Sequence, residues 1–259
     1  MNIMSPLSKK YCYVLLIMIG LAWMTPPDAH GQQQGKDDAH ALLTWVQKAY
    51  QDASYLGFHV KYLYTNAGAG AKPMDSLSGE MQMDKGRCRL VIDGMETIVM
   101  GKYIIQVMNE DKAIYLSSAG KAIPLDPTQV LDTVFRQMKG VQASIAMEGR
   151  NKVLTLRFPP GGTYTYIRME IDPVTGYFQR MTYGVRTAGL VSQDQISRPG
   201  RAAPYEQEGK IEMFFGNYEK GRFGDALFDE KNFFTHVAGH YEPAGHYKDY
   251  HIFLASSNL

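Results

Sequence analysis

The strongest constraint on the fold of this chain is an alternation of apolar and polar residues that recurs through most of its length. In "FHVKYLYT" the apolar residues Phe58, Val60, Tyr62 and Tyr64 alternate with polar ones, the spacing of a strand with one buried face. Ten further segments of this kind follow, and short Gly-, Asp- or Asn-bearing connections divide most of them. In one of them, "TIVMGKYIIQVM", we expect a bend at Gly101. This pattern favours strands that pair antiparallel with their neighbours.

Two segments have helical spacing instead. In "AHALLTWVQKAYQDAS", Leu42, Val46 and Ala49 share one stripe, behind two aspartates that favour a helix N-terminus. In "LDPTQVLDTVFRQMKG", Asp126 suits the N-cap, and Gly140 suits the position just after the helix. The apolar face of this second helix comprises Val130, Leu131, Val134, Phe135 and Met138.

The order of these elements predicts an α+β fold. A helix, about five strands, a second helix and about six strands do not form the alternating pattern of a parallel sheet, so one large antiparallel sheet fits best. Residues 188–209 contain few large apolar residues and read as a long mobile loop, because strand patterning resumes unchanged after them. We therefore expect one domain over residues 32–259.

The first 31 residues have the pattern of a signal peptide. Lys9 and Lys10 precede the apolar run "YVLLIMIGLAWM", and Ala29-His30-Gly31 places small residues where a signal peptidase cleaves, before Gln32. An uncleaved anchor is the alternative. No second long apolar segment follows, so we expect an exported, soluble chain without stable membrane insertion. Cys12 would leave with the signal, and Cys88 would remain as a single cysteine.

Charge and motifs argue against several functions. The net charge is near zero with no block of like charge, which argues against nucleic-acid binding. Four histidines, His236, His240, His246 and His251, gather near the C-terminus, but Gly239, Pro243 and Gly245 disfavour the helix that would align them as metal ligands. We expect no metal and no cofactor.

The sequence carries no motif of a known catalytic site. It has no nucleophile elbow, phosphate-binding loop or dinucleotide fingerprint, so we expect no enzyme. Arg87 and Arg89 flank Cys88 and favour a thiolate, but a small packing residue is the commoner role. The large flexible apolar residues stand out: Met81 and Met83 share one strand face, and Tyr164 and Tyr166 share another. Such residues line an acyl-chain cavity or simply fill a core.

Taken in order, these segments resemble the LolA-like superfamily of periplasmic lipoprotein carriers over about residues 38–255. The likeness is carried by the first helix, "YLGFHVKYLYT", "GEMQMDKGRCRLVIDG", "MGKYIIQVMNEDKAIYLSS", "MEIDPVTGYFQRMTYGV" and "GKIEMFFGNYEKGRFGDALFDEKNFF". The resemblance implies a strongly curved, incomplete β-barrel of about 10–11 strands, with two or three helices over its concave face.

The resemblance also implies a site. The family's strand arginine, which holds the helical lid closed, matches Arg89, with Arg87 as the alternative, because Gly86 stands where the family has a proline. The loop over 188–209 and the histidine-rich tail also depart from the family. The expected ligand-binding residues are Arg89, Met81, Met83, Val134, Phe135, Met138, Tyr164 and Tyr166.

Three functions remain open at this point. The first is a periplasmic, non-catalytic carrier for lipid or acylated, lipoprotein-like cargo, which it hands to an envelope acceptor protein. The second is a cell-envelope interaction module whose cavity its own side chains fill. The third is an unrecognised hydrolase, which would require polar titratable groups to converge in a cleft.

Overall fold

The computed structural model describes residues 33–68, 70–119, 140–192, 196, 204–256 and 259 of the 259-residue chain. These residues divide into two compact units. Unit 1 comprises the described residues within 33–52, 61–77 and 140–215, and unit 2 comprises those within 53–60, 78–119 and 216–259. Each unit is described by itself below. The single domain expected over 32–259 stays a prediction, and the expected signal peptide lies outside the described residues.

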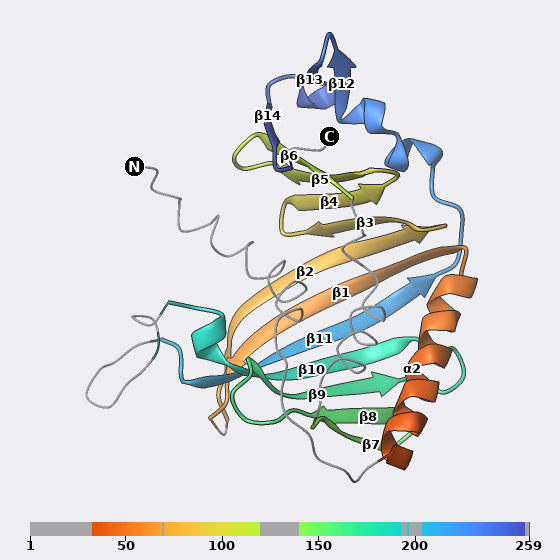
Figure 1. The fold of residues 1–259 in the computed structure, drawn as a ribbon, viewed down its shortest axis with the longest axis vertical. Coiled ribbons are helices and arrows are strands. Elements are labelled where there is room, and N and C mark those ends of the chain that lie inside the picture. The colour runs from red at the N-terminus through yellow and green to blue at the C-terminus, as the bar shows by residue number, and fades with distance from the viewer. Residues whose placement is uncertain (1–32, 69, 120–139, 193–195, 197–203, 257–258) are drawn as a thin grey trace. The chain divides into compact units, whose positions relative to one another are not determined.

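Strands are the main elements of the described residues, which also contain one α-helix, α2 (Gln33–Asp52) (Figure 1). Unit 1 contains strands in the hydrogen-bonded order β2-β1-β11-β10-β9-β8-β7, and unit 2 contains the order β14-β6-β5-β4-β3-β2-β1-β11. Three strands therefore contribute residues to both units, and twelve strands are linked in all. The strands are β1 (Tyr55–Asn66), β2 (Pro73–Asp84), β3 (Arg87–Ile92), β4 (Met95–Met100), β5 (Tyr103–Met108), β6 (Ala113–Ser118), β7 (Gln142–Glu148), β8 (Asn151–Arg157), β9 (Tyr164–Ile171), β10 (Phe178–Arg186), β11 (Glu208–Glu219) and β14 (His251–Leu254).

This topology confirms an α+β fold with a large, mostly antiparallel sheet, which is open because its first and last strands, β14 and β7, are not paired with each other. The pair β14–β6 is parallel. The sheet has 12 strands and not the expected 10–11, because Gly101 turns the chain back fully where only a bend was expected. Its φ of 54° makes a two-residue turn, and Met100 of β4 pairs with Tyr103 of β5.

The expectation of two or three helices is wrong for the described residues, which hold a single α-helix. The helix expected over 126–139 lies outside them. The expected loop over 188–209 is described only in part. Its described residues include a short 3₁₀ turn at Thr187–Gly189 and an isolated β-bridge between Ile196 and Tyr205.

In unit 1, α2 packs its predicted stripe against the strands. Leu42, Leu43, Val46 and Tyr50 are buried, and the Tyr50 hydroxyl accepts the backbone N–H of Phe178 at 3.2 Å. A tight turn after β9 follows from the local sequence Asp172-Pro173-Val174-Thr175-Gly176: Gly176 has a φ of 77°, and its N–H donates to the carbonyl of Asp172 at 2.9 Å. The strand register places four apolar residues in one row across strands β8–β11: Leu154, Met169, Met181 and Met213.

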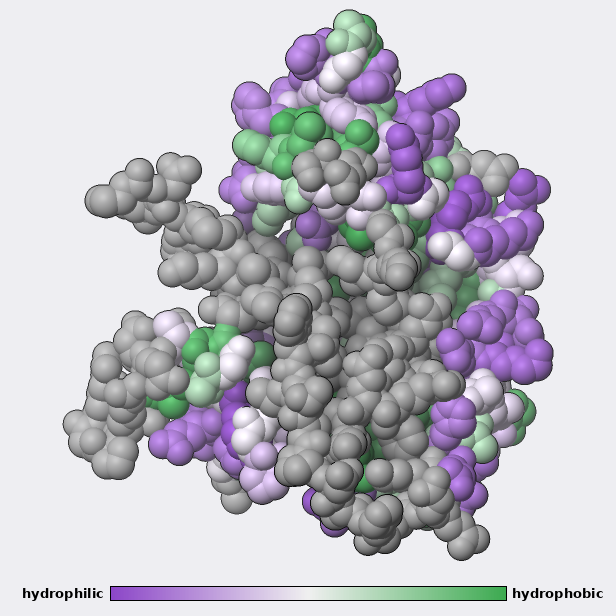
Figure 2. All heavy atoms as spheres, viewed as in Figure 1, coloured by the Kyte–Doolittle hydropathy of each residue, from purple (hydrophilic) through white to green (hydrophobic). Residues whose placement is uncertain are grey.

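In unit 2, residues 225–254, which we call the C-terminal segment, cover one face of strands β4–β6. This segment includes the two-stranded hairpin β12 (Phe234–Val237) and β13 (His240–Pro243), whose outer surface mixes hydrophobic and hydrophilic atoms at the tip (Figure 2). Its buried rings pack on the sheet: Phe234 lies 5.1 Å, centroid to centroid, from Tyr103. The sheet residues beneath are Ile98, Met100, Tyr103, Ile105, Val107, Ile114 and Leu116.

This packing predicts unequal effects for two phenylalanines of the segment. Phe234 is 3% exposed, so Phe234→Ala should lower the free energy of unfolding by about 3–5 kcal/mol through lost burial and the cavity it leaves. Phe253 is 48% exposed on β14, so Phe253→Ala should cost much less. Urea denaturation measures both. Equal losses would show that the segment does not pack on the sheet as described.

Candidate binding surfaces

Met81 and Met83 lie on an apolar face of unit 2, which we call the methionine face. The antiparallel register pairs Met81 with Leu90 and Met83 with Cys88, so these four side chains share one side of the β2–β3 hairpin. Met81 is buried, Met83 is half-buried, and the Cys88 Sγ lies 3.0 Å from the Met81 Sδ. The same face continues across β4 and β5 through Met95 and Ile104, which are both buried.

Arg89 lies on the opposite face of the same hairpin. Its cross-strand partner is Gln82, whose side-chain oxygen accepts from the guanidinium at 3.0 Å, and its Nε donates to Glu96. Glu96 also accepts the hydroxyl proton of Tyr247 at 3.3 Å. Burial and the nearby Glu96 carboxylate raise the pKa of Tyr247 to about 12, so this phenol remains a donor. Arg89 thus joins the sheet to the C-terminal segment, and the partners that it has among the described residues are the side chains of Gln82 and Glu96.

Arg87, the alternative match, shares the Arg89 face as the alternation predicts. Its guanidinium pairs with buried Asp84 and lies 4.6 Å from the ring centroid of Phe228, which belongs to the C-terminal segment. Both arginines therefore hold this segment, and neither side chain points to the methionine face. The other expected lining residues of the lid, Val134, Phe135 and Met138, lie outside the described residues.

Tyr164 and Tyr166 of unit 1 lie on opposite faces of the sheet, so the expectation that they share one is wrong. Tyr166 pairs with Gly184 and Tyr164 pairs with Val185, which leaves Thr165 as the extra residue of a β-bulge. The bulge turns Tyr164 into the core, where its ring lies 5.9 Å from that of Tyr183. Burial raises the pKa of Tyr164 to about 12 and also raises the pKa of Tyr183.

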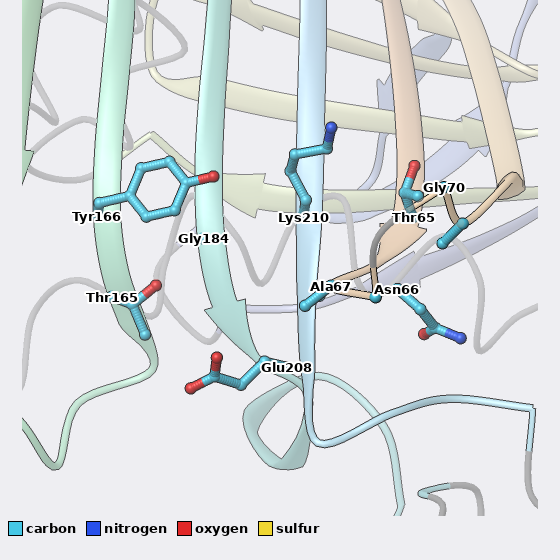
Figure 3. A pocket seen from close by; sticks show the side chains of 12 residues that line it. Thr65, Asn66, Ala67, Gly70, Thr165, Tyr166, Gly184, Glu208 and Lys210 are labelled. Carbon is cyan, nitrogen blue, oxygen red and sulfur yellow. The ribbon is translucent and has the colours of Figure 1, made fainter.

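Tyr166, on the other face, borders a trough across the neighbouring strands β9, β10, β11 and β1 of unit 1 (Figure 3). Its volume is about 310 Å³. Sequence reasoning missed this trough, although a glycine within a strand, Gly184, is a signal for it. It is lined by Thr65, Asn66, Ala67, Gly68, Gly70, Ala71, Thr165, Tyr166, Gly184, Glu208, Gly209 and Lys210.

Charged side chains form a network on the same face as the trough. Lys210 donates to Glu212 at 2.8 Å, and Arg180 pairs with Glu212 from the adjacent strand. Burial would raise the pKa of Glu212, but these two cations outweigh it and hold that pKa below its usual value. A second arginine, Arg168, pairs with Glu170 and Glu148.

The histidines of the C-terminal segment occupy separate places. His236 on β12 stacks near Tyr241 with ring centroids 4.7 Å apart, while His251 begins β14. Within the described ranges, no three His, Cys, Asp or Glu side chains are placed to hold a metal ion. None of the helices in those ranges has the length and apolar character needed to cross a membrane.

Comparisons with known proteins return likenesses between structures only. No family model and no curated protein matches the sequence. An uncharacterized conserved protein from Thermus thermophilus is 9% identical with a TM-score of 0.45, over 74% of this chain and 92% of the other. A LolA superfamily protein from Nitrosomonas europaea is 11% identical with a TM-score of 0.33, over 74% and 97%. An outer membrane lipoprotein-sorting protein domain from Vibrio parahaemolyticus is 7% identical with a TM-score of 0.36, over 75% and 97%.

The Arg89 contacts predict that this residue secures the C-terminal segment. Arg89→Leu should leave the half-buried Glu96 without its cation and lower the free energy of unfolding by about 1–3 kcal/mol. Backbone amides of β13 and β14 should then exchange faster with deuterium. Arg150→Leu, at an exposed hairpin turn, is the control and should change neither quantity. Unchanged exchange in Arg89→Leu would contradict this role.

The lowered pKa of Glu212 predicts a pH-dependent contribution to stability. The pKa of Glu212 is lower in the folded protein than in the unfolded chain, where it is about 4.3. Ionised Glu212 therefore stabilises the fold fully above the unfolded pKa, and this stabilisation is lost as the pH falls through the folded pKa. Glu212→Gln should therefore destabilise the protein by about 1–3 kcal/mol at neutral pH and by progressively less in acid. Urea titrations across this pH range measure the gap. The exposed Glu219→Gln on the same strand serves as control, and a gap independent of pH would refute the prediction.

Proposed function

We propose that this chain is a periplasmic, non-catalytic binding protein for lipid or acylated cargo, and that the acyl chains lie against the methionine face. The observation that carries the proposal is the division of unit 2 into two unlike faces. One face is covered by the chain's own C-terminal segment, and the other presents Met81 and Met83 beside Leu90 and Cys88. The periplasmic location is supported by the signal-like pattern of residues 1–31.

The chemistry of the methionine face suits acyl chains of varied shape. Methionine side chains are unbranched and polarizable, so they adapt to a ligand without the strain that a β-branched core would suffer. Each methylene removed from water contributes about 0.8 kcal/mol, so a handful of buried methylenes gives useful affinity. No covalent step is required, because handing cargo to an acceptor exchanges one burial for another.

The proposal keeps Val134, Phe135 and Met138 as expected ligand-binding residues, and all three lie outside the described residues. Their helical spacing places the three on one apolar stripe of the sequence, as a lid over an acyl chain requires.

Arg89 takes a different part in this proposal from the one that the family resemblance implies. It fixes the C-terminal segment to the far face through Glu96 and Tyr247, and so supports the sheet on which the cargo rests.

One observation favours the envelope interaction module as the second candidate. Strand β7 lies at the end of the hydrogen-bonded order, and its apolar residues Ile145 and Met147 are 39% and 59% exposed. Trp45 of α2 lies beside Ile145 in a groove of about 300 Å³. An edge strand with exposed apolar residues is suited to pairing with a segment of another protein.

A matched pair of variants on β2 tests the lipid proposal. Met83→Glu places a charge on the methionine face, whereas Gln82→Glu places the same charge on the opposite face beside Arg89. We expect Met83→Glu to weaken binding of a fluorescent fatty acid by at least about tenfold, because acyl contact would leave the carboxylate desolvated. Gln82→Glu should bind as the wild type does.

Native mass spectrometry of protein purified from a periplasmic fraction supplies the second measurement. The proposal expects lipid to co-purify with the wild type and with Gln82→Glu, and to be lost from Met83→Glu. Equal binding by both variants, or no binding by the wild type, would remove the methionine face as the site and favour the β7 edge.

A further inference from the structure

The trough of unit 1 is chemically unlike the methionine face and requires a separate explanation. At about 310 Å³ it lies at the small end of the range for small-molecule sites, roughly 300–1,000 Å³. Its lining is mainly polar and backbone-rich, with Tyr166 as the single aromatic ring. An acyl chain would gain little here, since few apolar groups would meet it, so a compact polar ligand fits better.

Gly184 allows Tyr166 to form a flat side of the trough. The two residues are cross-strand partners, and a Cβ at position 184 would lie 2.4 Å from the Cε1 atom of the Tyr166 ring. Without that Cβ, the ring reaches from β9 across β10, as Figure 3 shows. The face of an aromatic ring carries partial negative charge and attracts C–H groups of partial positive charge. The pyranose ring of a sugar presents such groups on its less polar side.

The remaining walls supply hydrogen-bonding groups of both kinds. Thr65 and Thr165 each provide a hydroxyl that donates and accepts, and Glu208 provides a carboxylate that accepts. Lys210 provides an ammonium donor, but Glu212 already holds it at 2.8 Å. A carboxylate and a cation that is already paired do not favour an anion. The mixture of donors and acceptors matches a row of neutral hydroxyl groups.

The positions of the two charges argue against an amino acid. Figure 3 shows the side chains of Lys210 and Glu208, which both line the trough, directed away from each other. The ammonium and carboxylate groups of an α-amino acid are attached to one carbon, so a single molecule would not reach both charges. A saccharide carries hydroxyl groups around its whole perimeter, so it can meet both charges.

Four hydrogen bonds join Asn66, Ala67 and Gly68, where β1 leads into the β1–β2 connection, to residues 204–208. The Asn66 side chain donates to the carbonyl of Pro204 and accepts from the N–H of Glu206, each at 3.1 Å. The N–H of Ala67 donates to the carbonyl of Glu208 at 3.1 Å, and the N–H of Gly68 donates to the Glu206 carboxylate at 3.2 Å. A wall held by four hydrogen bonds loses little conformational entropy on binding, which favours affinity for a small ligand.

We propose that this trough binds a neutral saccharide of one or two rings, stacked on Tyr166 and hydrogen-bonded by Thr65, Thr165 and Glu208. The site is independent of the proposed acyl-chain site, which belongs to unit 2. The saccharide can be free or can form the head of a lipid, and the two sources share this chemistry. The proposal therefore adds a second, polar specificity to the chain.

Saturation-transfer NMR with glucose, lactose and chitobiose, at millimolar concentration, tests the proposal on the full chain. We expect at least one of the three to bind, with the strongest transfer to its ring C–H protons. Tyr166→Ala should weaken binding by about tenfold, and Tyr166→Phe should retain most of it, because the ring face is preserved. Thr65→Val should also weaken binding, whereas Thr155→Val, outside the trough on β8, should not.

Further measurements distinguish a free saccharide from a lipid-linked one, and a saccharide from an amino acid or an anion. Phosphatidylcholine vesicles with and without lactosylceramide present the disaccharide of lactose on a lipid, so vesicle binding that requires lactosylceramide and Tyr166 also supports the proposal. Glycine and inorganic phosphate probe the amino-acid and anion alternatives. Met83→Glu should bind saccharides normally, so this proposal and the acyl-chain proposal can fail separately. Binding of glycine or phosphate instead, saccharide binding unaffected by Tyr166→Ala, or no saccharide binding in any form would overturn it.

Discussion

The register between neighbouring antiparallel strands is the constraint on which the rest of this structure depends. Because side chains alternate with period two, each cross-strand pair decides which residues of two strands share a face. Pairing Met83 with Cys88 places the sulfur-bearing residues together, and pairing Gln82 with Arg89 sends the cation to the other side. A slip of one residue would bury Arg89 among apolar side chains without Glu96, at a cost larger than most single interactions provide.

The β9–β10 pair of unit 1 contains two shifts in register, and the trough depends on the one at Thr165. The bulge at Thr165 lets Tyr164 enter the core while Tyr166 stays on the charged face. Gly184 is the complementary feature, since only a residue without a side chain leaves room for the Tyr166 ring above β10. A bulge and a facing glycine together re-aim one aromatic side chain, which is a common use of bulges near binding sites.

The sequence predicts those features that depend on residues close together in the chain. The stripe of α2 and the hairpin at Gly176 follow from local spacing, and both are present. The two-residue turn at Lys85-Gly86 sets the register that places Arg89 opposite Gln82. A glycine in so short a connection is a local signal for this register. The bulge at Thr165 has no such local signal, because it arises from pairing with a distant strand. The β12–β13 hairpin was missed because its turn places Ala238 at a φ of 49°, which alanine rarely adopts.

The C-terminal segment restricts which face of the unit 2 strands is available to a ligand. The sheet has two faces, and aromatic residues of this segment, such as Phe233 and Phe234, cover one of them. Arg87 and Arg89 reinforce that choice, because each pairs with a carboxylate of the sheet and also reaches the segment, by cation–π contact or through a shared acceptor. Opening this face to a ligand would expose those rings and break the ionic contacts together. Acyl cargo on the methionine face, as we propose, would leave those rings and ionic contacts in place.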